Sequence, residues 1–368
     1  MSEPDPTSPP NSSSDGEAPT LNPDLTRPPQ SGPARLRPTA EYVSGIREGD
    51  RVVLSQAITL LESTRPDHRK RAQAVVDACL PDAGESLRIA VTGVPGVGKS
   101  TFIERLGPRL LDAGRRLAVL AIDPSSEASR GSILGDKTRM GRLANHQNVY
   151  VRPSPTSGHL GGVARRTRET IFLCEAAGYD TVFVETVGVG QSEVSVRSMV
   201  DAFLLLTLAG AGDQLQGIKR GIVEMADVIA VNKADGDNRS AAETARVDYE
   251  RALELLSAPD EEWVVPVHTC SAETGDGLDE VWASVEEYCA FTKRTGRFET
   301  RRREQARHWI DQTIEDALRE DFDASPAVQS ARSDLEERVL RGELSSVGAA
   351  QELLRVYRAS IGPDEQGA

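Results

Sequence analysis

Short apolar runs alternate with helical patterns through the middle of the chain. Runs that predict buried strands lie at 87–91, 117–122, 149–152, 181–184, 203–208, 228–231 and 264–269, and a helical pattern covers 165–177. Strands that alternate with helices build a parallel sheet covered on both faces, because the crossover connections are right-handed. The pattern therefore predicts an α/β fold with a mostly parallel sheet over residues 87–293.

Residues 41–86 carry a helical pattern ahead of the first strand. Val52, Ala57 and Leu61 recur at helical spacing, Pro66 restarts the chain, and a second apolar stripe ends near Cys79. This predicts an N-terminal segment of two helices packed on the main domain, with a structural cap as its simplest role.

Residues 294–368 are helical in pattern and highly charged. Their apolar stripes are Trp309, Ile314 and Leu318, then Leu335, Val339 and Leu340, then Leu353, Leu354 and Tyr357. Narrow stripes outside the main core suit a C-terminal dimerisation arm. Packing within the chain is the alternative, because a stripe does not name its partner.

The composition excludes several classes of protein. The net charge of -14 at pH 7 argues against a general affinity for nucleic acid or anionic membrane. No apolar run approaches the length of a membrane span. The four cysteines are scattered without a C-x-x-C pair, which fits buried thiols in a reducing compartment.

Residues 1–40 are rich in Pro, Ser and Asp, and we expect a disordered leader. Its acidic residues precede the first arginine, Arg27, whereas a mitochondrial transit peptide is rich in Arg and poor in acids. We therefore expect a soluble cytoplasmic protein.

The stretch LRIAVTGVPGVGKST contains the phosphate-loop pattern G-x-x-x-x-G-K-[ST] between a strand and a helix. The predicted loop consists of Gly93, Val94, Pro95, Gly96, Val97, Gly98, Lys99, Ser100 and Thr101. Its glycines let backbone N–H groups turn inward on a phosphate, and the helix N-terminus adds partial positive charge. Lys99 would reach the β- and γ-phosphates, and the Ser100 hydroxyl would ligate Mg²⁺.

The sequence Asn232-Lys233-Ala234-Asp235 follows a predicted strand and selects the base. Asp235 can accept two parallel hydrogen bonds from the N1–H and 2-amino groups of guanine, and adenine has no such donor pair. The expected ligands are therefore GTP and GDP rather than ATP. Ser271, Ala272 and Glu273, after the last strand, would support the base.

Glu185 and Gly188 occupy the place of the D-x-x-G element that senses the γ-phosphate. The Gly188 N–H can approach the phosphate, and Glu185 can hold Mg²⁺ through water. Val189 stands where Ras-like enzymes carry the glutamine that orients the attacking water, so intrinsic hydrolysis should be slow. Gln191 lies too far along to be given that role.

Together these motifs resemble the MeaB/ArgK-type GTPases, bacterial counterparts of the human methylmalonic aciduria type A protein within the G3E group. The resemblance spans about residue 41 to the C-terminus. The matching segments are 93–101, 123–126, 130–140, 152–155, 161–166, 185–192 and 214–219.

The resemblance implies a homodimeric GTPase chaperone of adenosylcobalamin-dependent methylmalonyl-CoA mutase or a related mutase. It would gate loading of the cobalamin cofactor and protect or reactivate the mutase, with hydrolysis stimulated by that partner. It also implies that Asp123, Asp136 and Glu185 surround Mg²⁺ and the nucleotide, and that Lys219 belongs to a further switch. The alternatives are a solvated charge cluster around Asp136 and an ordinary surface lysine at Lys219.

Two other functions compete with this one. A nickel metallochaperone GTPase needs imidazole or thiolate ligands, usually in His-rich or Cys-bearing tracts, and here both residue types are scattered. A kinase acting on a protein or amino acid, as ArgK-type names suggest, needs a base and an acceptor pocket that the sequence does not reveal.

Overall fold

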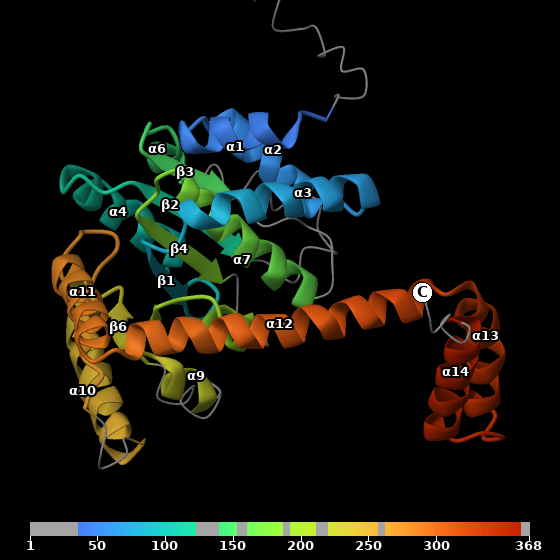
Figure 1. The fold of residues 1–368 in the computed structure, drawn as a ribbon. Coiled ribbons are helices and arrows are strands. Elements are labelled where there is room, and N and C mark those ends of the chain that lie inside the picture. Colours follow the sequence, from blue (N-terminus) through green and yellow to red (C-terminus); the bar gives the residue numbers. More distant parts are fainter. Residues whose placement is uncertain are drawn as a thin grey trace, which may run out of the picture. The chain divides into compact units, whose positions relative to one another are not determined.

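One parallel sheet forms the centre of the computed structural model, which describes residues 36–122, 140–152, 160–186, 192–210, 220–256 and 262–361. Its seven strands follow the order β3-β2-β4-β1-β5-β6-β7 (Figure 1). They are β1 (Leu87–Thr92), β2 (Leu117–Ile122), β3 (Val149–Arg152), β4 (Thr181–Thr186), β5 (Ala202–Leu208), β6 (Val228–Asn232) and β7 (Val267–Thr269). All neighbouring strands are parallel, which confirms the predicted α/β fold.

The last strand is shorter than predicted. Of the apolar run 264–269, only the final part enters the sheet, and Val264 is 81% exposed. Pro266 interrupts the run, because proline has no N–H to donate to a strand ladder. Its carbonyl still accepts a hydrogen bond from Ile229 N at 3.0 Å, which fixes where β7 starts beside β6.

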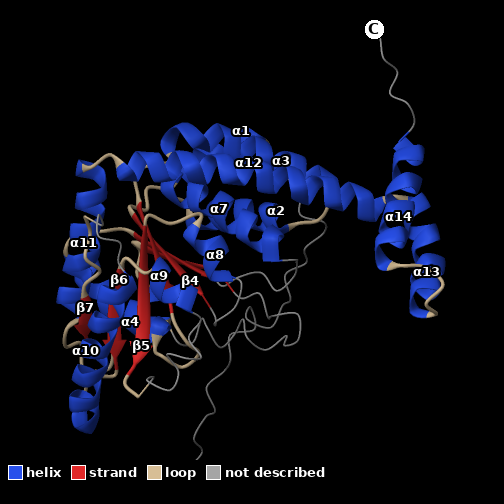
Figure 2. Ribbon diagram, turned by 90° about the horizontal axis from the view of Figure 1, so that it is seen from below, coloured by secondary structure: helices blue, strands red, loops and turns tan. Residues whose placement is uncertain are grey.

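Helices cover both faces of the sheet, as the view from below in Figure 2 shows. The helices between and after the strands are α4 (Lys99–Asp112), α6 (Gly141–Ala144), α7 (Leu160–Ala176), α8 (Ser192–Arg197), α9 (Arg220–Met225), α10 (Arg239–Leu256) and α11 (Leu278–Arg294). One core packs α4 and α11 against the sheet, with Phe102 of α4 and Val285 of α11 fully buried. Helix α7 contacts β2, α8 contacts β1 and β4, and α9 contacts β5.

The N-terminal segment contains three helices, not the two that the pattern predicted: α1 (Thr39–Arg47), α2 (Arg51–Glu62) and α3 (Pro66–Cys79). The extra break lies at Asp50, whose carboxylate accepts hydrogen bonds from Val52 N at 2.8 Å and Val53 N at 3.2 Å. This cap satisfies N–H groups that begin α2. Val53 is buried, whereas Val52 of the predicted stripe is 62% exposed.

The C-terminal part consists of α12 (Arg297–Ala324), α13 (Pro326–Leu340) and α14 (Ser346–Ile361). Trp309 is 3% exposed, and its indole N–H donates to Ser198 O at 2.9 Å. Ile314 and Leu318 are 52% and 59% exposed. The predicted stripe therefore divides: its first member packs within the chain, and the other two face outward.

Three further expectations concern membrane-spanning helices, the cysteines and the N-terminal leader. Among the described residues, no helix is long and apolar enough to cross a bilayer. All four cysteines are free and buried, as the sequence indicated. Residues 1–35 lie outside the described residues, so the disorder of the leader stays a prediction.

Candidate functional site

The candidate site lies where the strands end at the carboxyl edge of the sheet, as in other open α/β sheets. The loop 93–98 follows β1, and α4 begins at Lys99, with Phe102 N donating to Gly98 O at 2.8 Å. Val91 pairs with Glu185 in the register of β1 and β4. The sheet thus places the phosphate-loop motif beside the acidic residue that the sequence singled out.

Two loop positions require glycine. At Gly93 the backbone φ is +145°, and an added Cβ would lie 2.2 Å from Leu206 O. At Gly98 φ is +99°, and an added Cβ would lie 2.7 Å from the Asn232 side-chain nitrogen. L-residues rarely adopt these φ values, and neither neighbour leaves room for a side chain. The loop therefore lies close to Leu206 of β5 and Asn232 of β6.

Lys99 is a buried cation at the start of α4, 7% exposed. Its ammonium donates to Gly93 O at 2.8 Å and to Val94 O at 3.2 Å, so the side chain lies across the loop. Burial lowers the pKa of Lys99, and the negative charges of Glu185 and Glu193 oppose that shift. A cation held by backbone carbonyls in this position is suited to meeting anionic oxygens.

Ser100 and Glu185 meet beside the loop. The Ser100 hydroxyl donates to Glu185 Oε1 at 2.6 Å, and Glu185 is 6% exposed. A hydroxyl and a carboxylate are oxygen ligands of the kind that Mg²⁺ prefers. No group of three His, Cys, Asp or Glu suited to a metal occurs within the described ranges, so this pair is the described part of the candidate Mg²⁺ site.

Asn232 links the phosphate loop to the loop that follows β7. Its side-chain nitrogen donates to Val97 O at 2.7 Å, and its oxygen accepts from Ala272 N at 2.9 Å. The Cys270 thiol approaches the same oxygen at 3.7 Å. Asn232 is 1% exposed, so this buried amide connects the phosphate loop to the loop after β7.

Asp235 lies beside Ser271, whose hydroxyl donates to Asp235 Oδ2 at 2.5 Å. Between Asn232 and Asp235, Lys233 has a φ of +62°, which is uncommon for a residue other than glycine. Asn238 supports this turn by donating from its side chain to Lys233 O at 2.7 Å. The local backbone is thus held in the shape that carries Asp235.

Sequence comparison places the chain among known proteins. The sequence model of the family described as "Methylmalonyl Co-A mutase-associated GTPase MeaB" matches residues 54–327. The chain belongs to the MeaB family. The predicted resemblance is therefore confirmed.

Relatives of this MeaB family member include a probable GTPase of Mycobacterium tuberculosis, 53% identical over 85% of this chain and 93% of the relative. GTPase ArgK of Escherichia coli is 49% identical over 77% of this chain and 88% of its own. The mitochondrial methylmalonic aciduria type A homolog of Mus musculus is 44% identical over 86% and 79%. A solved structure titled as a LAO/AO transport system kinase aligns with a TM-score of 0.69 and 37% identity, over 87% of this chain and 97% of that one.

The structure brings together those predicted site residues that lie within its described ranges. The phosphate loop, Glu185, Asn232 and the segment 271–273 all lie at the carboxyl edge of the sheet. Pro95, Gly96 and Thr101 are exposed, whereas Val97 and Ala272 are buried. Four predicted residues lie outside the described residues: Asp123, Asp136, Gly188 and Lys219.

The sequence analysis missed three residues near the site. Glu193 at the start of α8 is 1% exposed and contributes to the electrostatics of Lys99. Arg105 and Arg109 of α4 donate to backbone carbonyls of the turn after β7. Their separation of four residues on one helix was a usable signal, because such residues share a face. Nothing in the sequence marked Glu193.

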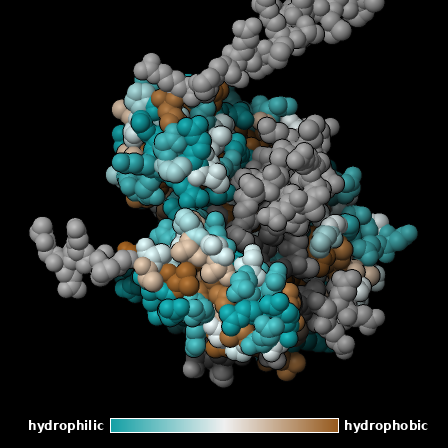
Figure 3. Space-filling model, turned by 90° about the vertical axis from the view of Figure 1, so that its right-hand side faces the viewer, coloured by the Kyte–Doolittle hydropathy of each residue, from teal (hydrophilic) through white to brown (hydrophobic). Residues whose placement is uncertain are grey.

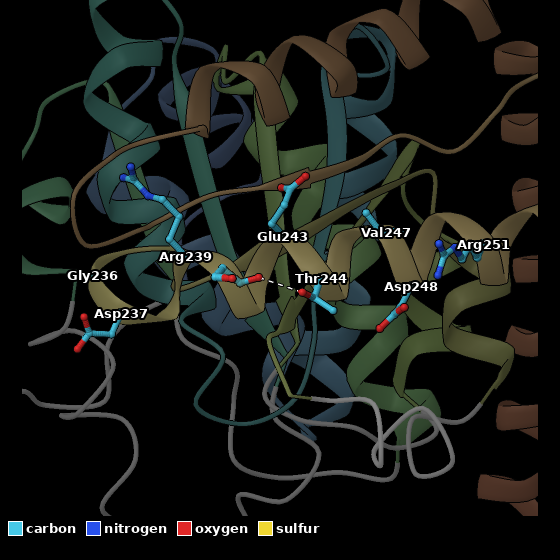
Figure 4. A pocket seen from close by; sticks show the side chains of 9 residues that line it. Gly236, Asp237, Arg239, Glu243, Thr244, Val247, Asp248 and Arg251 are labelled. Atoms are coloured by element: carbon cyan, nitrogen blue, oxygen red, sulfur yellow. Dashed lines mark hydrogen bonds between the residues drawn. The ribbon is translucent and has the colours of Figure 1, made fainter.

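A hollow of about 750 Å³ lies along α10 (Figure 4). Its lining residues are Gly236, Asp237, Arg239, Ser240, Glu243, Thr244, Val247, Asp248 and Arg251. Most of them come from one helix, on which Thr244 Oγ1 donates to Ser240 O at 3.1 Å. The lining begins at Gly236, directly after Asp235, and contains no residue of the phosphate loop.

Proposed function

We propose that this chain binds GTP and GDP at the carboxyl edge of its sheet and hydrolyses GTP to GDP and phosphate. The observation that carries the proposal is the pair of Asn232 side-chain hydrogen bonds. They connect the phosphate-loop motif to the loop after β7, where Ser271 donates to Asp235. Membership of a family described as GTPases supports it. The residues that would bind the nucleotide are 93–101, Asn232, Lys233, Asp235 and 271–273.

The phosphate side of the site would bind and neutralise the triphosphate. Phosphate oxygens can replace the loop carbonyls as acceptors for the Lys99 ammonium, since a charged acceptor forms the stronger hydrogen bond. Ser100 and Glu185 are the described residues that would hold Mg²⁺, with Asp123 and Asp136 as further acids. When bound, Mg²⁺ supplies charge neutralisation at the phosphates. Gly188 would sense the γ-phosphate through its N–H.

The base side would select guanine. Ser271 already donates to one oxygen of Asp235, which fixes the carboxylate in one orientation. Guanine offers that carboxylate two donors, and an adenine in its place would leave the acceptor positions that Ser271 does not use without a donor, at a cost of about 1–3 kcal/mol or more. Preference for guanine is thus an electrostatic consequence of Asp235.

We further propose that the partner is methylmalonyl-CoA mutase or a related adenosylcobalamin mutase. The chain would gate cobalamin loading and protect or reactivate that enzyme, with Lys219 in the switch that reports the nucleotide state. The description of the family and the name of the mouse relative support this assignment. Because Val189 replaces the usual water-orienting glutamine, hydrolysis should be slow alone and rise when the mutase binds.

Residues 294–368 would form a homodimerisation arm, and the protein would act in the cytoplasm. Ile310, Ile314 and Leu318 are each more than half exposed and recur every four residues on α12, so they share a face. The space-filling view in Figure 3 shows brown apolar patches among hydrophilic residues on the side of the molecule that lies to the right in Figure 1. We expect Ile314→Glu to shift the protein from dimer to monomer in sedimentation, with Arg319→Glu, on the same helix, as the control.

Calorimetry in Mg²⁺ buffer tests the nucleotide assignment. We expect GDP to bind and ADP not to compete. Asp235→Asn should lose GDP and gain xanthosine diphosphate, because an amide nitrogen can donate to the 2-oxo group of xanthine. Equal binding of ADP and GDP, or binding of neither, contradicts the proposal.

Product analysis with γ-labelled GTP tests the reaction and the partner. We expect free phosphate as the labelled product, released several-fold faster with the matching mutase. Label on a protein or amino acid would support the kinase alternative, and tight stoichiometric nickel binding would support the metallochaperone alternative. An unchanged rate with the mutase would refute the partner.

A further inference from the structure

Two arginines of α4 reach the turn that follows β7. The Arg105 guanidinium donates to Glu273 O at 3.0 Å and to Thr274 O at 3.3 Å. One helical turn later, Arg109 donates to Gly275 O at 2.8 Å. Three successive backbone carbonyls of one turn therefore accept hydrogen bonds from a single face of α4.

The contacted turn is the one that presents Ser271. Gly275 N donates to Ser271 O at 2.8 Å, and Thr274 N donates to the Ser271 hydroxyl oxygen at 3.1 Å. The same hydroxyl donates to Asp235 Oδ2. A continuous path of hydrogen bonds thus runs from α4 through this turn to the carboxylate that would bind guanine.

Arg109 is itself held in place from the other side. Its second guanidinium nitrogen lies 2.6 Å from Asp279 Oδ2, in the first turn of α11. A guanidinium that binds a carboxylate and a carbonyl together is restricted in orientation, because its donors form a rigid fork. Neither arginine has a hydrogen bond to residues 93–98 within the described ranges, so their hydrogen bonds to the nucleotide site reach its base side and not the phosphate loop.

We propose that Arg105 and Arg109 are positioning residues for guanine recognition, which hold the Ser271 turn so that Asp235 keeps the orientation guanine needs. The inference rests on the proposed function. Because α4 also begins with Lys99 and Ser100, one helix then orients both halves of the nucleotide site.

The test compares GDP with inosine diphosphate, which lacks only the 2-amino group that Asp235 would accept. The double variant Arg105→Met/Arg109→Met keeps the aliphatic stems and removes the donors. We expect the ratio of GDP to inosine diphosphate affinity to fall about threefold to tenfold, as for loss of charge-assisted hydrogen bonds that are partly exposed. Affinity for pyrophosphate, which probes the phosphate loop alone, should stay within about twofold of wild type.

Arg115→Met is the matched control. Arg115, three residues after the end of α4, pairs with Glu286 of α11 at 2.8 Å and lies 4.0 Å from Asp180. Among the described residues it has no hydrogen bond to carbonyls 273–275. This variant should lose an ion pair to α11, the helix that Arg109 also contacts, and keep the wild-type ratio. If the double variant does not fold, Arg105→Met alone carries the test, with a smaller fall in the ratio.

The outcomes separate the inference from the proposed function. An unchanged ratio in variants that bind GDP overturns the inference, and so does an equal loss of GDP, inosine diphosphate and pyrophosphate, which indicates a merely structural role. If the wild-type protein does not distinguish GDP from ADP, the proposed function fails and the inference fails with it.

Discussion

The two edges of the sheet hold buried charge in opposite ways. At the carboxyl edge, the Lys99 ammonium donates to backbone carbonyls, and burial lowers its pKa. At the amino edge, Arg88 of β1 donates to both oxygens of Glu175, at 2.8 and 2.9 Å, and these side chains are only 6% and 2% exposed. At the carboxyl edge the Lys99 ammonium can therefore bind an anion, whereas at the amino edge Arg88 and Glu175 neutralise each other.

At the amino edge, a second ion pair connects the sheet to α12, the first helix of the C-terminal part. Asp201, which precedes β5, accepts from Arg88 N at 2.9 Å and from the Arg302 guanidinium of α12 at 2.7 and 2.8 Å. Asp227, which precedes β6, pairs with Arg197. Since each of these carboxylates has a cationic partner, the edge stabilises the fold and offers little to a ligand. The comparison indicates that ion-paired buried charges stabilise the fold, whereas a buried cation held by carbonyl groups can still bind an anion.

The largest effect should come from breaking the buried pair at the amino edge. Glu175→Ala leaves the Arg88 guanidinium buried and removes acceptors from Ser86 Oγ and Gly84 N. Removal of one partner from a buried ion pair costs about 3–5 kcal/mol. We expect a loss of that size in the free energy of unfolding, measured by urea denaturation. Nucleotide affinity well below the unfolding transition should be unchanged.

The combined variant Arg88→Met/Glu175→Leu is the control for this prediction. With both charges replaced by apolar groups, no uncompensated ion remains, and much of the lost stability should return. If the combined variant were as unstable as Glu175→Ala, the charge account would be wrong, and the lost hydrogen bonds of Ser86 and Gly84 or the packing around Glu175 would explain the loss.

At the carboxyl edge, Lys99→Met should cost function and spare stability. We expect GTP hydrolysis to fall by roughly a hundredfold, equivalent to about 2.7 kcal/mol. Burial holds the pKa of Lys99 below its unfolded value, so the protonated lysine destabilises the fold, and this penalty lessens as pH rises through the folded pKa. Without nucleotide the variant should therefore be at least as stable as wild type near neutral pH. A variant that unfolds more readily would erase the contrast between the two edges.

Motifs that depend on a few adjacent residues could be predicted from sequence. The phosphate loop is one such motif, because strand, glycines and helix start follow each other directly, and the structure describes them as a continuous unit from β1 to α4. The parallel sheet could also be predicted, because alternating strands and helices leave few topologies. These inferences need no knowledge of which residues meet across the fold.

Contacts between distant segments could not be predicted in the same way. Asn232 forms hydrogen bonds with Val97 and Ala272, which lie 135 and 40 positions away in the sequence, and no local pattern indicates such a pairing. Trp309 shared a helical spacing with Ile314, yet only the tryptophan is buried, since its indole finds a carbonyl at Ser198. A stripe gives the face of a helix but not the surface that covers it.

Asn232→Ala should affect both stability and binding, because this residue belongs to the carboxyl edge and is fully enclosed. It leaves Val97 O and Ala272 N without their partner, which costs about 1–3 kcal/mol for buried groups. We expect the loss to be shared between the unfolding free energy and the GDP affinity. Asn238→Ala, which removes an exposed bond to Lys233 O, is the control and should change both quantities less.

The smallest effect should come from an ion pair outside both edges. Arg47 and Asp82 lie 2.7 Å apart between α1 and the turn after α3, with side chains 49% and 37% exposed. Exposed pairs contribute about 0–1 kcal/mol, and salt screens them. Asp82→Asn should therefore lower the unfolding free energy by less than about 1 kcal/mol, and the difference should shrink in high salt. A loss as large as that of Glu175→Ala would show that burial is not what separates the structural charges from the others.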